Sequence, residues 1–224
     1  MLHFVLVEPA VPENVGAAAR ALNTMGLTSL WIVNSSAHRD KGARILAHGS
    51  GHVLEQVREF ASLAEVRDEV DYMVGTSAKP RHHRDILLAP EQLCQQLQDK
   101  GNTVADTALV FGREDSGLHS HEIALCDLLT SIPLARPYPS LNLGQAVMLY
   151  AYVLQQLTPP ETDAEVVPDQ YQSLRRKCAA LLQQVGYERQ EKLYQWLMER
   201  LSLLNKRDIG FAHHLVDKLS NKIR

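Results

Sequence analysis

Short, almost entirely apolar runs alternate with longer segments of helical spacing along the first 157 residues. The apolar runs are predicted strands at residues 2–7, 30–33, 72–75, 108–111 and 128–132. Helical spacing occurs at residues 14–25, 43–48, 53–60, 63–70, 90–100, 121–126 and 143–157. Strands that are apolar on both sides and separated by helices are typical of a parallel sheet covered on both faces. The sequence therefore predicts an α/β domain over residues 1–157, with a mostly parallel sheet and helices on both faces.

A different composition follows this predicted domain. Residues 158–168 are rich in proline and acidic residues, which is typical of a linker. Beyond them, residues 171–185, 190–204 and 208–223 have helical spacing. We therefore expect a small helical extension over residues 169–224. Because it has little apolar area of its own, it should pack on the body or on another subunit.

The charge of the chain is divided unevenly between these two parts. Residues 1–168 hold 12 Lys and Arg against 20 Asp and Glu, a net charge of −8, whereas residues 169–224 hold 11 against 6, or +5. A basic extension on an acidic body favours a polyanionic partner. Solvated faces of ordinary helices would give the same asymmetry.

The chain of 224 residues, 45% of them hydrophobic, can bury a substantial core. Its apolar runs fall short of the roughly 20 residues that span a bilayer, and no basic leader precedes the first strand. We therefore expect a cytoplasmic protein without a membrane partner. Cys94, Cys126 and Cys178 are widely spaced and lack a CxxC partner, so we expect reduced, partly buried side chains.

Small, polar and glycine residues follow three of the predicted strands, at residues 14–16, 112–117 and 140–146. Ligands of parallel sheets bind beyond the carboxyl ends of the strands, so the three segments together predict a ligand site. Each alone also has a structural explanation. Asn14 is expected to cap the first helix, which Gly26 would end, and Ser140 or Asn142 would cap the helix at 143–157.

Basic residues near these segments favour an anionic ligand. Arg20 lies among alanines on the first predicted helix, which leaves its guanidinium accessible to a phosphate or carboxylate. Residues 79–84 hold two arginines, two histidines and a lysine after the strand at 72–75, which suits contact with a phosphate backbone. An ordinary solvated loop would have the same composition.

Two other kinds of site are disfavoured. Gly49 and Gly51 are not followed by the third glycine of a dinucleotide-binding fingerprint. His48 with His52, and His119 with His121, have spacing that metals can use, but no carboxylate or cysteine in the sequence pattern completes either set. We therefore expect no metal ion.

Taken together, Asn14-x-Gly16 with Arg20, Gly112-x-Glu114-x-x-Gly117 and Ser140-Leu141-Asn142-x-Gly144-x-Ala146 resemble the three motifs of the SPOUT superfamily of RNA methyltransferases. The branch that they resemble most is the tRNA cytidine/uridine 2′-O-methyltransferases. The resemblance covers residues 1–157 well and the extension less well. It implies a trefoil knot in the C-terminal part of the domain, a homodimer, S-adenosylmethionine bound in the knot, and no metal.

The resemblance also implies roles for individual residues. The cofactor would contact Thr76, Ser77, Ala78, Gly112, Glu114, Gly117, Ile132, Leu134, Ser140, Leu141 and Asn142. Catalytic roles would fall to Arg20, Ser140 and Asn142, and RNA contacts to Asn14, Arg20, Arg81 and Arg84. Arg20 would reach the ribose across the dimer interface. Because a guanidinium hardly ever deprotonates, we expect Arg20 to orient the 2′-hydroxyl and stabilise the oxyanion, while water or phosphate accepts the proton.

The predicted function is methylation of a ribose 2′-hydroxyl in structured RNA, with the tRNA anticodon loop as the favoured substrate. A single-stranded loop can present its sugar and base to such a site. The segment Pro133-Leu134-Ala135-Arg136-Pro137-Tyr138-Pro139 before the third motif holds two extra prolines, which leave the choice of RNA open. The alternatives are a ribose methyltransferase for rRNA, a non-catalytic RNA-binding relative, and a nucleotide-binding oxidoreductase.

Overall fold

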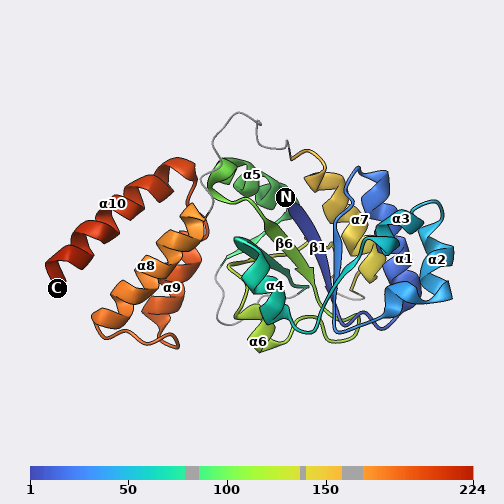
Figure 1. Ribbon diagram of the computed structural model, residues 1–224, viewed down its shortest axis with the longest axis horizontal. Coiled ribbons are helices and arrows are strands. Elements are labelled where there is room, and N and C mark those ends of the chain that lie inside the picture. Colours follow the sequence, from blue (N-terminus) through green and yellow to red (C-terminus); the bar gives the residue numbers. More distant parts are fainter. Residues whose placement is uncertain (79–85, 137–139, 158–168, 224) are drawn as a thin grey trace.

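A seven-stranded, entirely parallel sheet forms the centre of the body (Figure 1). The structure is a computed structural model that describes residues 1–78, 86–136, 140–157 and 169–223. The strands follow the order β3-β2-β1-β6-β4-β7-β5. Their bounds are β1 (Leu2–Val7), β2 (Leu30–Val33), β3 (Arg58–Phe60), β4 (Tyr72–Thr76), β5 (Leu87–Leu88), β6 (Thr107–Phe111) and β7 (Leu128–Thr130). The predicted parallel sheet is confirmed.

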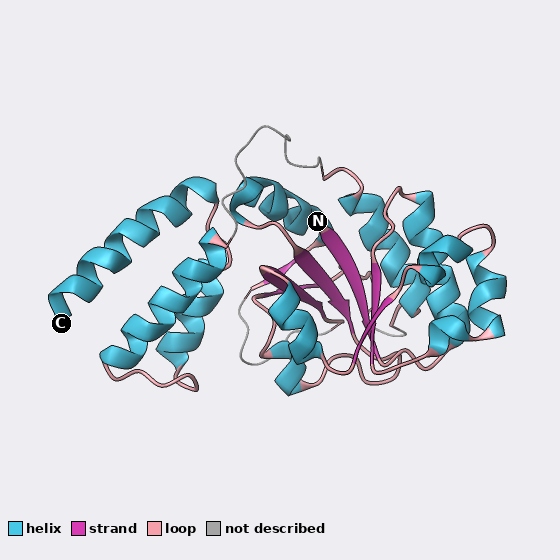
Figure 2. Cartoon of the chain, viewed as in Figure 1, coloured by secondary structure: helices cyan, strands magenta, loops and turns pink. Residues whose placement is uncertain are grey.

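Helices cover both faces of this sheet, as Figure 2 shows. Because neighbouring side chains of a strand point to opposite faces, Phe4 and Leu6 of β1 join one core, whereas Val5 and Val7 join the other. Five helices of the body pack on the first face: α1 (Pro12–Thr24), α2 (Lys41–Ala47), α3 (Gly51–Glu55), α5 (Pro90–Lys100) and α7 (Leu143–Leu154). On the second face lie α4 (Leu63–Glu69) and α6 (Ser120–Ile123). The predicted α/β class with two covered faces is confirmed.

Some predicted elements are wrong in detail. The predicted helix at 53–60 is the short helix α3 followed by strand β3, in which Arg58 and Glu59 are exposed at the sheet edge and hide the strand pattern. The two-residue strand β5 was not predicted. Asn14 does not cap α1, because the helix already begins at Pro12, a position that suits the fixed φ of proline. Gly26 follows the helix end with a φ of +72°, as expected of a terminating glycine.

Three helices, α8 (Gln170–Gln184), α9 (Lys192–Leu201) and α10 (Lys206–Ile223), make up the extension. It packs on the body: the Tyr72 hydroxyl donates to the Ser202 carbonyl oxygen at 2.9 Å, and the Tyr72 and Tyr171 rings meet edge to face at 5.2 Å. The Lys100 ammonium lies over both rings and donates to the Leu204 carbonyl oxygen at 3.2 Å. Burial of a cation against two aromatic faces fixes this contact.

The three cysteines are all free and buried. Among the described helices, none is both long and apolar enough to cross a bilayer. The predicted linker at 158–168 lies outside the described residues. The predicted knot stays a prediction, because part of the approach to the third motif, residues 137–139, also lies outside them.

Candidate functional site

A cavity of about 430 Å³ opens where β4, β6 and β7 end. This volume falls within the range of about 300 to 1,000 Å³ that is usual for small-molecule sites. The lining comes from three segments: residues 76–78 after β4, residues 111–118 after β6, and a set of residues that follow β7. This last set is Ser131, Ile132, Leu134, Ser140, Leu141, Leu143, Ala146 and Tyr150. Ligand sites of parallel sheets are expected at this carboxyl edge.

The cavity brings together ten of the eleven residues predicted to hold the cofactor: Thr76, Ser77, Ala78, Gly112, Glu114, Gly117, Ile132, Leu134, Ser140 and Leu141. Asn142 is not in the lining. The lining also contains Phe111, Arg113, Asp115, Ser116, Leu118, Ser131, Leu143, Ala146 and Tyr150, which were not predicted. Most of these are immediate neighbours of motif residues, so the motif boundaries drawn from the sequence were too narrow.

The turn after β6 requires glycine at its first position. A Cβ on Gly112 would lie 2.1 Å from the backbone carbon of Gly117, which no side chain can tolerate. Arg113 and Gly117 close the turn with two backbone hydrogen bonds, and Gly117 has a φ of +70°. Gly112 therefore lets the two ends of this turn lie against each other beside the cavity.

Glu114 holds the segment that leads into α1. Its carboxylate accepts hydrogen bonds from the backbone N–H of Ala10 and Val11 and from the amide of Asn14, at 3.1 to 3.3 Å. Burial raises the pKa of Glu114, but these hydrogen bonds together outweigh it and leave that pKa lowered. The ionised carboxylate adds negative charge beside the cavity.

Asn14 and Asn142 connect two of the motifs directly. The Asn142 amide nitrogen donates to the Asn14 side-chain oxygen at 2.7 Å. The Asn142 side-chain oxygen caps α7, because it accepts from the backbone N–H of Gly144 at 2.8 Å and of Gln145 at 3.4 Å. The expected cap is thus Asn142, and its contacts hold the start of α7 beside α1 next to the cavity.

The glycines of the first and third motifs serve helix packing. A Cβ on Gly16 would lie 2.2 Å from the Ala43 carbonyl oxygen of α2, and one on Gly144 would lie 2.9 Å from the Ala17 Cβ of α1. Gly16 lies inside α1, as the helical spacing at residues 14–25 predicts. These glycines let α1 approach α2 and α7 closely.

Arg20 is separated from the cavity of its own chain. It is exposed on α1 and is not among the lining residues. It lies six residues beyond Asn14, a rise of about 9 Å along the helix and a rotation that places it on another face. The other two arginines predicted to contact RNA, Arg81 and Arg84, lie outside the described residues.

The extension uses part of its positive charge internally. Arg175 pairs with the buried Asp127 of the body at 3.1 Å, Lys177 pairs with Asp217 at 2.7 Å, and Arg176 pairs with Asp169. The other described cations of the extension are exposed: Arg189, Lys192, Arg200, Lys206, Arg207, Lys218 and Lys222.

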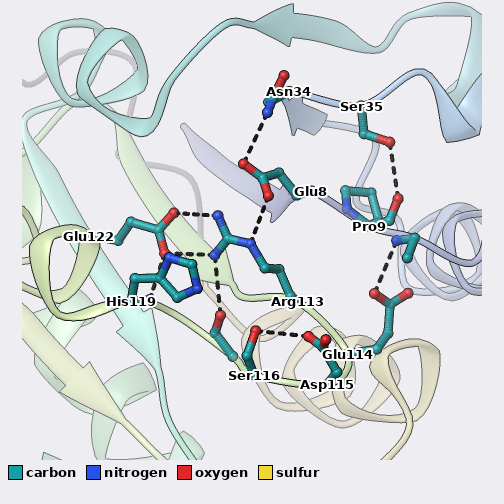
Figure 3. A network of polar contacts seen from close by, with 12 residues as sticks. Glu8, Pro9, Asn34, Ser35, Arg113, Glu114, Asp115, Ser116, His119 and Glu122 are labelled. Carbon is teal, nitrogen blue, oxygen red and sulfur yellow. Dashed lines mark hydrogen bonds and ion pairs between the residues drawn. The ribbon is translucent and has the colours of Figure 1, made fainter.

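The side chains of His119, His121 and Glu122 gather on one side of α6, with ligand atoms within 4.8 Å of one another. The prediction that no carboxylate lies with His119 and His121 is therefore wrong. Both Glu122 oxygens, however, accept hydrogen bonds from Arg113 at 3.0 Å, and one also accepts from the His119 backbone N–H (Figure 3). The carboxylate is already committed to an arginine.

Comparisons with known proteins agree with this geometry. The "SpoU rRNA Methylase family" matches residues 1–152, and the C-terminal domain of "tRNA/rRNA methyltransferase LasT" matches residues 168–223. The uncharacterized tRNA/rRNA methyltransferase LasT of Escherichia coli is 43% identical over 98% of this chain and 97% of its own length. The tRNA (cytidine/uridine-2′-O-)-methyltransferase TrmJ of Cronobacter sakazakii is 36% identical over 73% of this chain and 66% of its own length.

Among solved structures, TrmJ from Z. mobilis superposes with a TM-score of 0.67 and 25% identity, over 98% of this chain and 99% of that one. The resemblance seen in the three motifs is therefore confirmed, together with the expected methyltransferase activity and the S-adenosylmethionine cofactor. With a family match over residues 1–152 and a relative that is similar along almost the whole chain, the protein belongs to the SpoU rRNA methylase family.

Proposed function

We propose that this protein transfers the methyl group of S-adenosylmethionine to a ribose 2′-hydroxyl in the anticodon loop of tRNA. The observation that carries the proposal is the gathering of the predicted cofactor residues around one cavity at the carboxyl edge of the sheet. Relatives that are 33% and 36% identical carry the names of tRNA 2′-O-methyltransferases, which supports the ribose and the tRNA.

The residues around the cavity fit this cofactor. S-adenosylmethionine carries a positive sulfonium and an ammonium group, and two acidic residues, Glu114 and Asp115, are among those that line the cavity. Phe111, Leu143 and Tyr150 supply apolar surface for the adenosyl part. When bound, the cofactor supplies an electrophilic methyl group. The chain then has to hold the ribose oxygen in line with the methyl carbon and the sulfur, and such positioning accelerates transfer.

Arg20 would act on the ribose bound at the partner subunit's cavity. Two features support this assignment: Arg20 is exposed, and it lies on a helix that the Glu114–Asn14–Asn142 contacts fix beside the cavity. Its guanidinium would orient the 2′-hydroxyl and stabilise the developing oxyanion, with water or an RNA phosphate as the proton acceptor. Ser140, which lines the cavity, would contact the cofactor and the reacting ribose.

A homodimer is part of this proposal, because the site needs Arg20 from a second chain. Exposed apolar side chains on α7 support it: Leu149 is 41% and Tyr152 58% exposed. Val11, next to the start of α1, is 40% exposed. Since α1 and α7 pack together, a partner that covers these side chains would bring its own α1 near the cavity.

RNA would be held largely by positive charge. The proposed phosphate contacts are the exposed Arg189, Lys192, Lys206 and Arg207 of the extension, with Arg81 and Arg84 of the body. Lys100 and Arg175 are excluded from this role, because both are used to attach the extension to the body. Binding of RNA should weaken steeply as salt is added.

The test is methyl transfer to purified RNA. The full chain, S-adenosylmethionine and either total tRNA or rRNA are incubated, and ribose methylation is mapped by mass spectrometry. We expect a new 2′-O-methyl group in the anticodon loop of tRNA. Methylation of rRNA alone would contradict the tRNA assignment, and methylation on a base would contradict the ribose.

Variants then test the role of Arg20. We expect Arg20→Ala to bind S-adenosylmethionine normally and to lose turnover by about 100-fold or more, since a donor to an oxyanion is typically worth this much. Arg44→Ala, which removes an exposed cation of α2, is the control and should keep turnover. Full turnover of Arg20→Ala would refute the catalytic role. Mixed dimers of Arg20→Ala with a cofactor-binding variant should recover activity if the site is shared.

A further inference from the structure

Arg113 makes more charged contacts than its place in a cavity turn requires. Its Nε donates to a Glu8 carboxylate oxygen at 2.8 Å, and its Nη1 and Nη2 donate to the two oxygens of Glu122 at 3.0 Å each (Figure 3). Nη1 also donates to the Gly117 carbonyl oxygen at 3.4 Å. Four of its five N–H donors are therefore used inside the protein.

These contacts lie in a partly desolvated place, where ion pairs are stronger than on the surface. The Arg113 side chain is 14% exposed and that of Glu122 is 6% exposed. A bidentate arginine–carboxylate pair also fixes an orientation, because both groups are planar. By contrast, the exposed pair of Arg58 and Glu69 is free to exchange with water.

The cluster is not arranged to bind RNA. Arg113 carries one positive charge, whereas Glu8 and Glu122 each carry one negative charge. The hydrogen bond from Arg113 holds the pKa of Glu8 down at about 2, so both partners stay ionised at neutral pH. With a net charge of −1 and four donors occupied, the cluster would not attract a phosphate.

The positions of the partners show what the cluster holds. Glu8 directly follows β1 and has a φ of +47°, a conformation that costs a non-glycine residue energy and is held by its surroundings. Its carboxylate is held by Arg113 and by the Asn34 amide, at 2.8 and 3.0 Å. The neighbour of Arg113, Glu114, binds the backbone just beyond, at residues 10–11. Two consecutive residues of the turn thus hold the segment between β1 and α1.

We infer that Arg113 is a positioning residue for methyl transfer, which fixes the cofactor turn at residues 112–117 against the end of β1 and against α6. The fixed turn presents Gly112 and Gly117 to the cofactor. The fixed β1–α1 segment sets the place of α1 and hence of Arg20. The inference rests on the proposed use of the cavity for S-adenosylmethionine.

The test replaces the arginine and its buried partner together, because removing one alone leaves a buried charge unpaired and could unfold the protein. In the full chain, we expect Arg113→Met combined with Glu122→Gln to raise the Kd of S-adenosylmethionine by about tenfold. The KM for the cofactor should rise similarly, while the KM for RNA stays within about twofold. Arg113→Lys keeps the charge but loses the planar guanidinium. Its Kd for S-adenosylmethionine should lie between those of wild type and the double variant.

A matched control separates positioning from general loss of stability. Arg67 and Asp127 form an equally buried pair, 12% and 0% exposed, next to the amino ends of β4 and β7 and away from the cavity. Arg67→Met combined with Asp127→Asn should lower the thermal midpoint but leave the cofactor Kd unchanged. The inference would be overturned if the cofactor Kd of the Arg113 and Glu122 double variant were unchanged. An equal rise of the cofactor Kd in both double variants would also overturn it. If wild type binds the cofactor but does not methylate ribose, the proposed function fails while the inference stands.

Discussion

Replacing Asn142 by aspartate would test whether the cap of α7 is also a connection between motifs. Aspartate is as good a helix cap as asparagine and keeps the oxygen that accepts from Gly144 and Gln145. It loses the amide that donates to Asn14 at 2.7 Å. Asn14 cannot turn its own amide to compensate, because that amide donates to Glu114 at 3.1 Å.

The magnitude follows from these contacts. Loss of the hydrogen bond from residue 142 to Asn14 costs about 1 kcal/mol of stability. The repulsion between the Asn14 oxygen and the new carboxylate costs about 1 kcal/mol more. The favourable interaction of the negative aspartate cap with the dipole of α7 offsets about 0.5 kcal/mol of this loss in stability. We therefore expect Asn142→Asp to lower the free energy of unfolding by about 1.5 kcal/mol. Asn142→Ala, which loses both the cap and the hydrogen bond, should cost about 2 kcal/mol.

Asp40 provides the matched control, because it caps α2 by accepting from the Gly42 backbone N–H at 2.7 Å. Asp40→Asn exchanges the same two residue types at a cap and should change the free energy of unfolding by less than about 0.5 kcal/mol. Urea denaturation at pH 7 measures these values, and calorimetry measures the Kd of S-adenosylmethionine. Only the Asn142 variants should weaken cofactor binding. If Asn142→Asp proved as stable as wild type, Asn14 would not be oriented by Glu114.

Three further predictions concern other contacts. Gly112→Ala should lower cofactor affinity at least about tenfold in calorimetry, because its Cβ would meet backbone atoms at 2.1 to 2.2 Å; wild-type affinity would mean that the turn can open. Burial lowers the pKa of Lys100 from 10.5 to about 8. Between these two pH values, Lys100 is therefore protonated in the unfolded chain but not in the folded one. The free energy of unfolding should therefore rise from pH 8 to 10.5 in wild type relative to Lys100→Met, and parallel pH curves would contradict the burial of the charge. Arg175→Ala, which removes a partner of buried Asp127, should cost about 1 to 2 kcal/mol in denaturation, whereas exposed Arg176→Ala should cost less than about 0.5 kcal/mol; equal costs would argue against an anchoring role for Arg175.

Much of the site could be predicted from the sequence because its residues stand close together in short motifs at strand ends. Gly112, Glu114 and Gly117 follow one strand directly, so predicting the strand also placed the turn. Arg113 stands in the same turn but was not singled out. Its partners, Glu8 and Glu122, come from two other elements, and no spacing along the chain joins the three.

The sequence was also insufficient to assign a role where one residue type can have two different structural roles. Gly16 and Gly144 were counted among the residues of the ligand site, yet they allow helices to approach closely, which depends on the neighbour across the contact. Arg175, Arg176 and Lys177 look like a basic patch. Arg176, however, pairs with Asp169 at the start of its own helix, and Arg175 and Lys177 find acidic partners once α8 packs against the body and α10.

The amino-acid sequence by itself determined the alternation of strands and helices, the parallel sheet and the edge at which the cavity lies. These follow from local apolar periodicity and from the rule that parallel strands end at one side. Only the tertiary structure decided how the three motifs are held together. The contacts of Asn142 with Asn14, of Asn14 with Glu114 and of Arg113 with Glu8 join residues separated by 100 positions or more. Such contacts depend on side-chain geometry within about 3 Å, which the folded chain alone creates.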